Sequence, residues 1–182
     1  MIQSSIGRFI DPSIIASHFH LREGDVIADF GSGSGHYLKP LSQAVGPSGR
    51  VYACEIQKNL VERLGVVIHD QRLGNVSPVW CDIEAHHGTK FADGILDAAL
   101  LSNVMFQFED KESALREVAR SMHKGSRLFV IDWTDSFGGL GPRPEDVVSE
   151  VSARALLQKT GFSCDHTFPA GDHHYGIFCY RQ

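Results

Sequence analysis

A glycine-rich turn follows directly on a short apolar run near the start of the chain. The run ends in Asp29 and Phe30, and Gly31, Gly33 and Gly35 then alternate with serines before a helical pattern begins. Glycines allow tight backbone geometry and remove the side chains that would block a ligand. The start of the helix then offers backbone amides to that ligand. This turn predicts an α/β protein with a ligand site at the carboxyl end of a parallel strand.

Short apolar runs alternate with helical patterns along the rest of the chain, which predicts repeated β–α units and a mainly parallel sheet. Strands are predicted over 25–30, 50–56, 76–83, 95–102, 127–132, 162–168 and 175–180, and helices over 34–45, 58–71, 110–123 and 146–160. The last two strands flank a turn at 169–172, so one of them should run antiparallel to the rest. We expect a doubly wound, mainly parallel, seven-stranded sheet with one antiparallel strand from a C-terminal β-hairpin and helices on both faces.

The composition is that of a single ordinary domain. The 182 residues are 42% hydrophobic and 21% charged, which is the balance of a globular protein. Lys and Arg number 17 against 22 Asp and Glu, a net charge of −5, so a nucleic-acid partner is not expected. No apolar run approaches the ~20 residues that span a bilayer, and residues 1–11 lack the features of a signal peptide. We therefore expect a cytoplasmic protein without a membrane partner.

The four cysteines are expected to be reduced. Cys54, Cys81, Cys164 and Cys179 each lie in an apolar, strand-like run, and none forms a C-x-x-C pair. Four mostly buried thiols are the simpler interpretation, and the disulfide framework of a secreted protein is the alternative. The ten histidines match no zinc signature, so no metal site is predicted.

The spacing of the turn discriminates between ligands. A dinucleotide fold requires the pattern G-x-G-x-x-G, in which Gly31 and Gly33 fit but His36 stands at the third place. Asp29 lies two residues before the first glycine, where a carboxylate would repel a pyrophosphate and attract an ammonium or a sulfonium. The turn therefore favours a cationic ligand over NAD.

Two further carboxylates are expected at the ends of the next predicted strands. Glu55 follows Gly35 by 20 residues, and a carboxylate at this place can accept hydrogen bonds from ribose hydroxyls. Asp82 could accept a hydrogen bond from the exocyclic amine of adenine, with Ile56 and Ile83 on either side of the purine. Together the three acids predict a pocket for an adenosyl ligand with a cationic tail.

Segment 29–35 resembles the first motif of the class I S-adenosylmethionine-dependent methyltransferases. Glu55 resembles the acidic residue that ends their second strand, 81–83 their adenine-side motif, and 96–104 their fourth-strand motif. Segments 9–12 and 171–176 are similar to the small form of this family that is grouped with the ubiquinone/menaquinone biosynthesis methyltransferases. Ser32 stands where the family often has cysteine, and 123–126 departs from its Lys-Pro-Gly-Gly run. The resemblance covers almost the whole chain.

The resemblance implies an enzyme that transfers a methyl group from S-adenosyl-L-methionine on a Rossmann-like fold. It implies that the cofactor is bound by Asp29, Gly31, Ser32, Gly33, Gly35, Glu55, Ile56, Asp82, Ile83, Ser102 and Asn103. In-line displacement from a sulfonium requires mainly that the acceptor be held ~3–3.5 Å from the methyl carbon. The alternative is a module that binds S-adenosylmethionine or S-adenosylhomocysteine in a regulatory or scaffolding role. A third interpretation is an enzyme that uses S-adenosylmethionine for another reaction.

The acceptor is expected over the ends of the fourth and fifth predicted strands. Apolar side chains from three segments are available to line its site: Phe9, Ile14, Phe19, Met105, Phe106, Trp133, Phe137 and Leu140. Such a lining fits a small neutral or hydrophobic molecule. His174 or Tyr175 could orient the acceptor or take its proton, so these two are the candidate catalytic residues. Segment 102–106 lacks the Asn/Asp-Pro-Pro-Tyr/Phe run of methyltransferases that act on planar amino groups.

We predict one methyltransferase domain over 1–182, divided into an N-terminal lid helix (1–22), a cofactor-binding half (23–132) and an acceptor-side half with the C-terminal hairpin (133–182). Pro12 suits the first position of the lid helix. The later helices are expected to occupy both faces of the sheet. The apolar face of the N-terminal segment should therefore cover the ligand cleft, with Ile10, Ile14, Ile15 and Phe19. A helix packed permanently on the sheet is the alternative.

Overall fold

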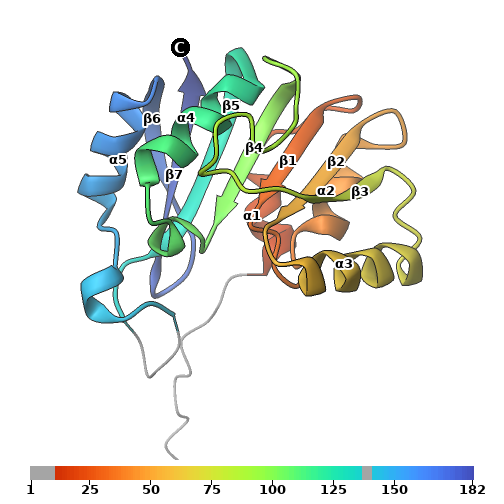
Figure 1. Ribbon diagram of the computed structural model, residues 1–182, viewed down its shortest axis with the longest axis horizontal. Helices are drawn as coiled ribbons and strands as arrows, with labels where there is room; N and C mark the ends of the chain where they lie inside the picture. Colours follow the sequence, from red (N-terminus) through yellow and green to blue (C-terminus); the bar gives the residue numbers. More distant parts are fainter. Residues whose placement is uncertain (1–10, 137–140) are drawn as a thin grey trace, which may run out of the picture.

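The computed structural model describes residues 11–136 and 141–182, and its centre is a seven-stranded sheet with the order β3-β2-β1-β4-β5-β7-β6 (Figure 1). The strands are β1 (Val26–Phe30), β2 (Arg50–Glu55), β3 (Val76–Trp80), β4 (Leu96–Ser102), β5 (Met122–Trp133), β6 (Phe162–Pro169) and β7 (His174–Arg181). Strands β1 to β5 pair in parallel, and β7 is antiparallel to both of its neighbours. The predicted fold class is confirmed. The order reverses between β1 and β4, which is where open α/β sheets bind ligands.

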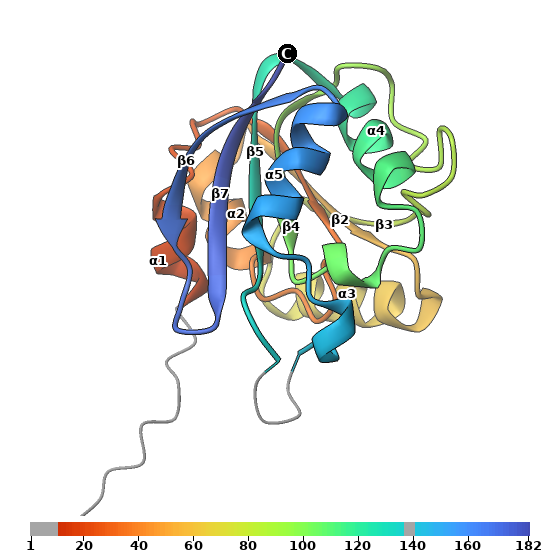
Figure 2. The same cartoon turned by 90° about the vertical axis from the view of Figure 1, so that its left-hand side faces the viewer.

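Helices cover both faces of the sheet. They are α1 (Pro12–Ser17), α2 (Leu38–Val45), α3 (Lys58–Asp70), α4 (Lys111–Ser121) and α5 (Glu150–Lys159), with short 3₁₀ turns at Met105–Gln107 and Pro144–Asp146. One core cluster contains the apolar side chains of α4 and α5, and a second contains those of α1, α2 and α3. Figure 2 shows α1 on one side of the sheet and α4 and α5 on the other.

Several element boundaries differ from the predicted ones because of local turn chemistry. Helix α2 begins at Leu38 instead of residue 34, since Gly33 and Gly35 have positive φ angles of 53° and 83°. Strand β3 ends at Trp80 rather than Ile83. Helix α5 begins only at Glu150, after a Ser149 cap, because 144–146 forms a separate 3₁₀ turn.

The later helices cover both faces of the sheet as expected, but α1 also packs in the core, in the same cluster as α2 and α3. Phe19 is completely buried, and its ring stacks on that of Phe129 in β5 at a centroid distance of 4.0 Å. Ile15 is also buried, while Ile14 is 57% exposed. Helices α2 and α3 contact β1, β2 and β3, so they leave room over β5 for the segment with α1 and Phe19. A lid role for residues 1–22 stays a prediction.

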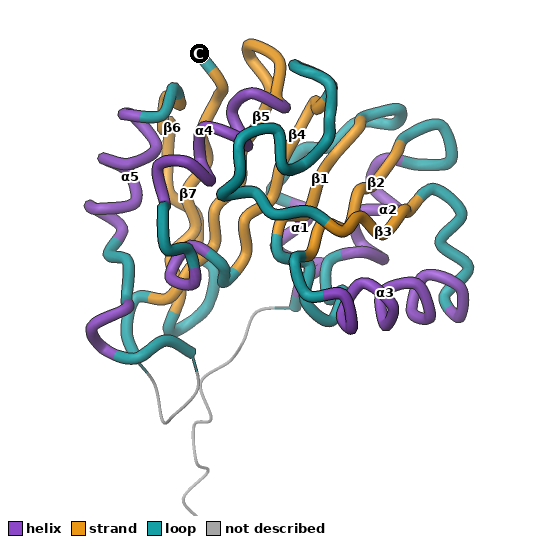
Figure 3. Tube along the Cα trace, in the orientation of Figure 1, coloured by secondary structure: helices purple, strands orange, loops and turns teal. Residues whose placement is uncertain are grey.

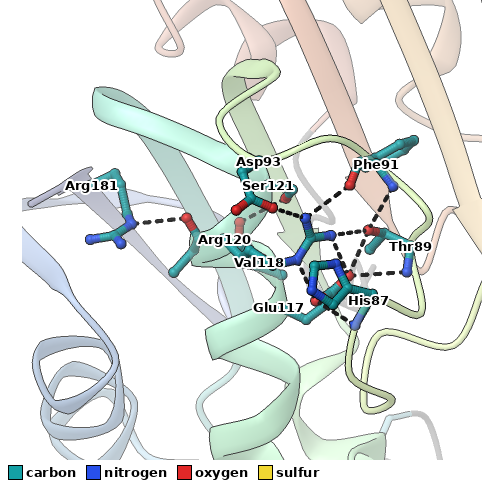
Figure 4. Close-up of polar contacts among 10 residues, drawn as sticks. His87, Thr89, Phe91, Asp93, Glu117, Val118, Arg120, Ser121 and Arg181 are labelled. Atoms are coloured by element: carbon teal, nitrogen blue, oxygen red, sulfur yellow. Dashed lines mark hydrogen bonds and ion pairs between the residues drawn. The ribbon is translucent and has the colours of Figure 1, made fainter.

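The segment 84–94 is a loop, and it crosses one face of the sheet beside α4 (Figure 3). The buried carboxylate of Glu117 in α4 holds it (Figure 4). This carboxylate accepts hydrogen bonds from the backbone amides of His87 and Thr89 and from the Thr89 hydroxyl, at 2.6–3.1 Å. Arg120 pairs with Glu117 at 2.8 Å and donates to the Phe91 carbonyl. The loop is therefore held against α4 by an ion pair and its hydrogen bonds, whereas a helix in this place would pack through apolar side chains.

The four cysteines are free thiols, and only Cys164 is not fully buried.

No helix in the described part of the chain is long and apolar enough to cross a membrane.

Candidate functional site

A cleft of about 410 Å³ opens at the carboxyl ends of β1, β2 and β3, beside the switch in strand order. This volume lies within the range of small-molecule sites. Of the predicted cofactor-binding residues, the cleft brings together Gly31, Glu55, Ile56, Asp82 and Ile83. It is completed by residues that were not predicted: Cys54, Cys81, Glu84, Val104, Gln107, Phe108 and Glu109. The cleft lining does not include the other predicted residues, which lie within four positions of Gly31 or Val104 in the sequence: Asp29, Ser32, Gly33, Gly35, Ser102 and Asn103.

Gly31 is the residue of the turn that the geometry most strongly requires. Its φ is 77°, and a Cβ atom placed there would lie 2.6 Å from Cγ2 of Val104. Any side chain would therefore meet both backbone strain and a clash with the opposite wall. The backbone amides of Gly31 and Ser32 donate to the Cys54 carbonyl at 2.9 and 3.0 Å. The turn thus fixes the end of β2 against β1.

Glu55 is held at the cleft wall by three backbone amides. Its Oε1 accepts hydrogen bonds from Ile56 and Gln57 at 2.9 and 3.0 Å, and its Oε2 accepts one from Gly33 at 3.2 Å. A carboxylate has about four lone-pair sites, so it can accept a further bond from a ligand. The side chain is buried, and its position is set before any ligand binds.

Asp29 is a buried carboxyl group behind the glycine turn, and it is 2% exposed. Burial raises its pKa to about 7, the nearby Glu55 carboxylate adds to this rise, and a hydrogen bond with Ser32 opposes it. No ion pair with Asp29 is found among residues 11–136 and 141–182. A cationic group bound next to it would favour its charged form.

The outer side of the cleft is formed by two isoleucines and their supports. Ile83 is buried, and Ile56 is 53% exposed. The indole of Trp80 donates a hydrogen bond to the Ile56 carbonyl at 2.8 Å, which fixes the turn after β2. Asp82 accepts a bond from the Glu84 amide at 2.9 Å. Both isoleucines are therefore supported at the rim, as a purine sandwich requires.

The loop after β4 closes the other wall. Asn103 has a φ of 56°, and its side-chain Oδ1 is buried with no hydrogen-bond partner in the described part of the chain. An orphaned acceptor is costly, so it suits a ligand donor. Asp132 at the end of β5 accepts bonds from the amides of Met105 and Trp133 at 3.0 and 2.8 Å and so fixes this loop. Burial raises the pKa of Asp132 to about 6, although these hydrogen bonds oppose the rise.

Sequence reasoning missed Asp132, Glu84 and Glu109. Asp132 ends a predicted strand, as Asp29 and Glu55 do, and that position is the signal that could have found it. Glu84 accepts a bond from the Asp110 amide at 2.6 Å and so joins the loop after β3 to the start of α4. No sequence spacing indicates that contact.

The candidate catalytic residues lie apart from the cleft lining. His174 and Tyr175 are both buried and face Trp133 and Asp132 across the β5–β7 ladder. The Tyr175 hydroxyl donates to the Val148 carbonyl at 2.9 Å, and burial raises its pKa. The His174 ring packs on Trp133 at a centroid distance of 4.2 Å, and burial lowers its pKa. Their catalytic role stays a prediction.

The predicted acceptor lining is only partly described. Met105, Phe106 and Trp133 are buried or partly buried near the end of β4 and β5, whereas Phe19 belongs to the core under α1. Phe9, Phe137 and Leu140 lie outside the described residues. No group of three or more potential metal ligands occurs in the part of the chain that the structure describes.

The reversed strand order, the glycine turn and the carboxylates at the strand ends are the features of a nucleoside-binding α/β domain with the fold of class I methyltransferases. The chain belongs to the family called "Methyltransferase domain", whose sequence profile matches residues 28–130. The predicted class I S-adenosylmethionine-dependent methyltransferase is thereby confirmed, and S-adenosylmethionine is the cofactor that the family implies.

Individual relatives agree with this assignment. The ubiquinone/menaquinone biosynthesis C-methyltransferase UbiE of Pasteurella multocida is 31% identical over 121 residues, 63% of this chain and 42% of the relative. The UbiE of Hahella chejuensis is 29% identical over 138 residues, 75% of this chain and 54% of the relative. The chain thus spans about half the length of these relatives. A SAM-dependent methyltransferase from Aquifex aeolicus has a similar crystal structure, with a TM-score of 0.88, 26% identity, and coverage of 96% of this chain and 91% of that one.

Proposed function

We propose that the protein binds S-adenosylmethionine in the cleft and transfers its methyl group to a small neutral or hydrophobic acceptor. The observation that carries this proposal is the Glu55 carboxylate, which three backbone amides orient at the wall of a 410 Å³ cleft. In this role Glu55 accepts hydrogen bonds from the ribose hydroxyls, and Asp82 accepts one from the adenine amine. Ile56 and Ile83 enclose the purine. Residues 23–132 form the cofactor-binding half, and 133–182 the acceptor-side half.

Two groups next to the cleft, outside its lining, are suited to the cationic tail of this cofactor. Asp29 is a buried carboxyl group with a raised pKa, and an ammonium would stabilise its charged form. The unpartnered Oδ1 of Asn103 can accept a hydrogen bond from the same ammonium. S-adenosylmethionine, when bound, supplies an electrophilic methyl group on a sulfonium. The chain positions the acceptor in line with that methyl group and excludes water from it.

The proposed class of acceptor rests on the side chains near the ends of β4 and β5. Met105 and Trp133 are buried and Phe106 is partly buried, and such a lining favours an apolar molecule. The relatives from Pasteurella multocida and Hahella chejuensis are named as C-methyltransferases, so a carbon atom is one candidate acceptor atom. The proposed location is the cytoplasm, and the proposed partner is a small molecule, not a nucleic acid.

The decisive experiment measures formation of S-adenosylhomocysteine from S-adenosylmethionine with a panel of phenols, thiols, quinols and arsenite. We expect turnover with at least one small acceptor, and none with a variant in which Gly31 is replaced by Val, which closes the cleft against Val104. Calorimetry adds the comparison with NAD, which should not bind. Binding of S-adenosylhomocysteine without turnover of any acceptor would favour the regulatory module instead, and tight binding of NAD alone would contradict both.

A further inference from the structure

Two cysteines face each other across the C-terminal hairpin. In the antiparallel ladder of β6 and β7, Cys164 pairs directly with Cys179. Directly opposed residues in such a ladder have Cα atoms about 4.5 or 5.5 Å apart, and a disulfide bridges about 4.4–6.8 Å. Both cysteines are free thiols. The backbone therefore already holds them at a separation that a disulfide can bridge.

The two thiols have different surroundings. Cys179 is completely buried in the core under α4 and α5, whereas Cys164 is only partly buried at the edge of the same cluster. The neighbouring Cys179 thiol lowers the pKa of Cys164, and the positive charge of Arg154 in α5 contributes to the lowering. The same contact and burial raise the pKa of Cys179. Cys164 is thus the accessible group that ionises first.

We propose that Cys164 and Cys179 form a reversible oxidation site whose oxidant is a hydroperoxide. The arrangement pairs a partly exposed thiol that ionises readily with a buried second thiol directly opposite it in the ladder, as redox-sensing cysteines require. The outer position of β6, at the edge of the sheet, leaves the first thiol open to a small oxidant. The inference does not depend on the proposed methyl transfer.

The reaction takes two steps. The Cys164 thiolate attacks one oxygen of hydrogen peroxide, the O–O bond breaks, hydroxide leaves, and Cys164 becomes a sulfenic acid. The Cys179 sulfur then attacks the Cys164 sulfur, the S–O bond breaks, and water leaves with the proton of Cys179. In sum two thiols lose two electrons and two protons, and peroxide is reduced to two molecules of water.

A second pair of thiols in the same chain provides an internal control. Cys54 and Cys81 also contact each other, in the floor of the cleft. Burial raises the pKa of Cys54, and the carboxylates of Asp29 and Glu55 raise it further. Both thiols of this pair are buried, so neither offers peroxide the partly exposed thiol that Cys164 offers. The pair should therefore stay reduced under conditions that oxidise the hairpin pair.

The test exposes the wild-type protein to hydrogen peroxide, alkylates the remaining thiols and maps them by mass spectrometry without reduction. Trypsin releases 160–181 as one peptide, which should carry no alkyl group and be two hydrogens lighter. Cleavage before Asp165 and Asp172 should leave the fragments with Cys164 and Cys179 joined until dithiothreitol is added. Cys54 and Cys81 should be alkylated. Equal bridging of Cys54 and Cys81, bonds between chains only, or an unreacted Cys164 would overturn the proposal.

Variants test the order of the two steps. In Cys179→Ser, dimedone should trap a sulfenic acid on Cys164, whereas in Cys164→Ser it should not label Cys179. Arg154→Gln should slow alkylation of Cys164 at neutral pH by about two- to fivefold, because its pKa rises. Arg143→Gln, which removes an exposed arginine paired with Asp146, should leave that rate unchanged. Labelling of Cys179 in the absence of Cys164, or equal rates in both arginine variants, would contradict the assigned roles.

Discussion

Glu55 is proposed to bind the ligand, and it also accepts hydrogen bonds from the protein backbone. Its removal should therefore affect both ligand affinity and stability. The sequence suggests a carboxylate that only contacts the ligand, but three backbone amides also depend on it. Glu55→Ala should weaken binding of S-adenosylhomocysteine by about 1.5–3 kcal/mol, the range for hydrogen bonds to charged groups. It should also destabilise the fold by about 1–3 kcal/mol, because three partly buried amides lose their acceptor. Calorimetry measures the affinity and urea unfolding measures the stability. Unchanged affinity in a folded variant would contradict the proposed role of Glu55 in ligand binding.

Asp29 should couple cofactor binding to proton release. Its pKa in the free protein is about 7, and a bound ammonium favours the charged carboxylate. S-adenosylhomocysteine should therefore release about one proton per molecule near pH 6 and bind up to about tenfold more weakly there than near pH 8, by proton linkage. Calorimetry in buffers of different ionisation enthalpy measures the released proton.

The sign of the stability effect of Asp29 follows from the same raised pKa. Because its folded pKa of about 7 lies above the ordinary value of 3.8, the free protein gains stability from the protonated form and loses it as pH rises between these values. Asp29→Asn should remove both the proton release and this part of the pH dependence. Full proton release in Asp29→Asn would assign the effect to another group.

At the scale of elements, β3 and β4 are joined by a loop, and the ion pair of Glu117 and Arg120 in α4 anchors that loop (Figure 4). Burial alone would raise the pKa of Glu117, but hydrogen bonds from Arg120 and Thr89 lower it from 4.5 to about 2. Glu117→Gln should destabilise the fold by about 1.5–3 kcal/mol near neutral pH, because the partly buried Arg120 guanidinium loses one of its two carboxylate partners and keeps only the exposed Asp93. The matched control is Glu112→Gln on the same helix, whose partners are exposed, and it should cost less than about 1 kcal/mol.

The contribution of Glu117 should disappear in acid. A carboxyl group whose folded pKa is lowered stabilises the fold above its unfolded pKa and loses this effect as pH falls through the folded one. The gap between wild type and Glu117→Gln should therefore shrink between pH 4.5 and about 2, as measured by urea unfolding. A constant gap over that window would mean that Glu117 acts only through packing.

Helix α1 should behave as a structural element in hydrogen exchange. Phe19 is completely buried against Phe129, and Arg127 binds the His20 carbonyl. We expect residues 12–20 to show strong protection without ligand and no increase when S-adenosylhomocysteine is added. A lid predicts weak protection that rises on binding. A clear rise in the protection of these residues on ligand binding would support the lid instead.

At the scale of the whole molecule, the sequence predicts what is encoded locally and misses what depends on distant contacts. The glycine turn, the carboxylates Asp29 and Glu55 and the strand alternation are each visible within a few residues, and they suffice for the fold and most of one cleft wall. The place of α1 depends on space left over Phe129, more than 100 residues away in the chain. Asp132 likewise acquires its role only when β5 meets the loop after β4.

If the cleft forms one cooperative unit with the sheet, ligand binding should stabilise the entire domain. A ligand that binds only the folded state at about 100 times its dissociation constant adds about 2.7 kcal/mol. For a domain of this size each kcal/mol raises Tm by about 2–4 °C, so S-adenosylhomocysteine should raise Tm by about 5–10 °C, measured by calorimetric scanning. NAD at the same concentration should not shift Tm, and Glu55→Ala should reduce the shift. An equal shift in Glu55→Ala would mean that the ligand binds elsewhere on the molecule.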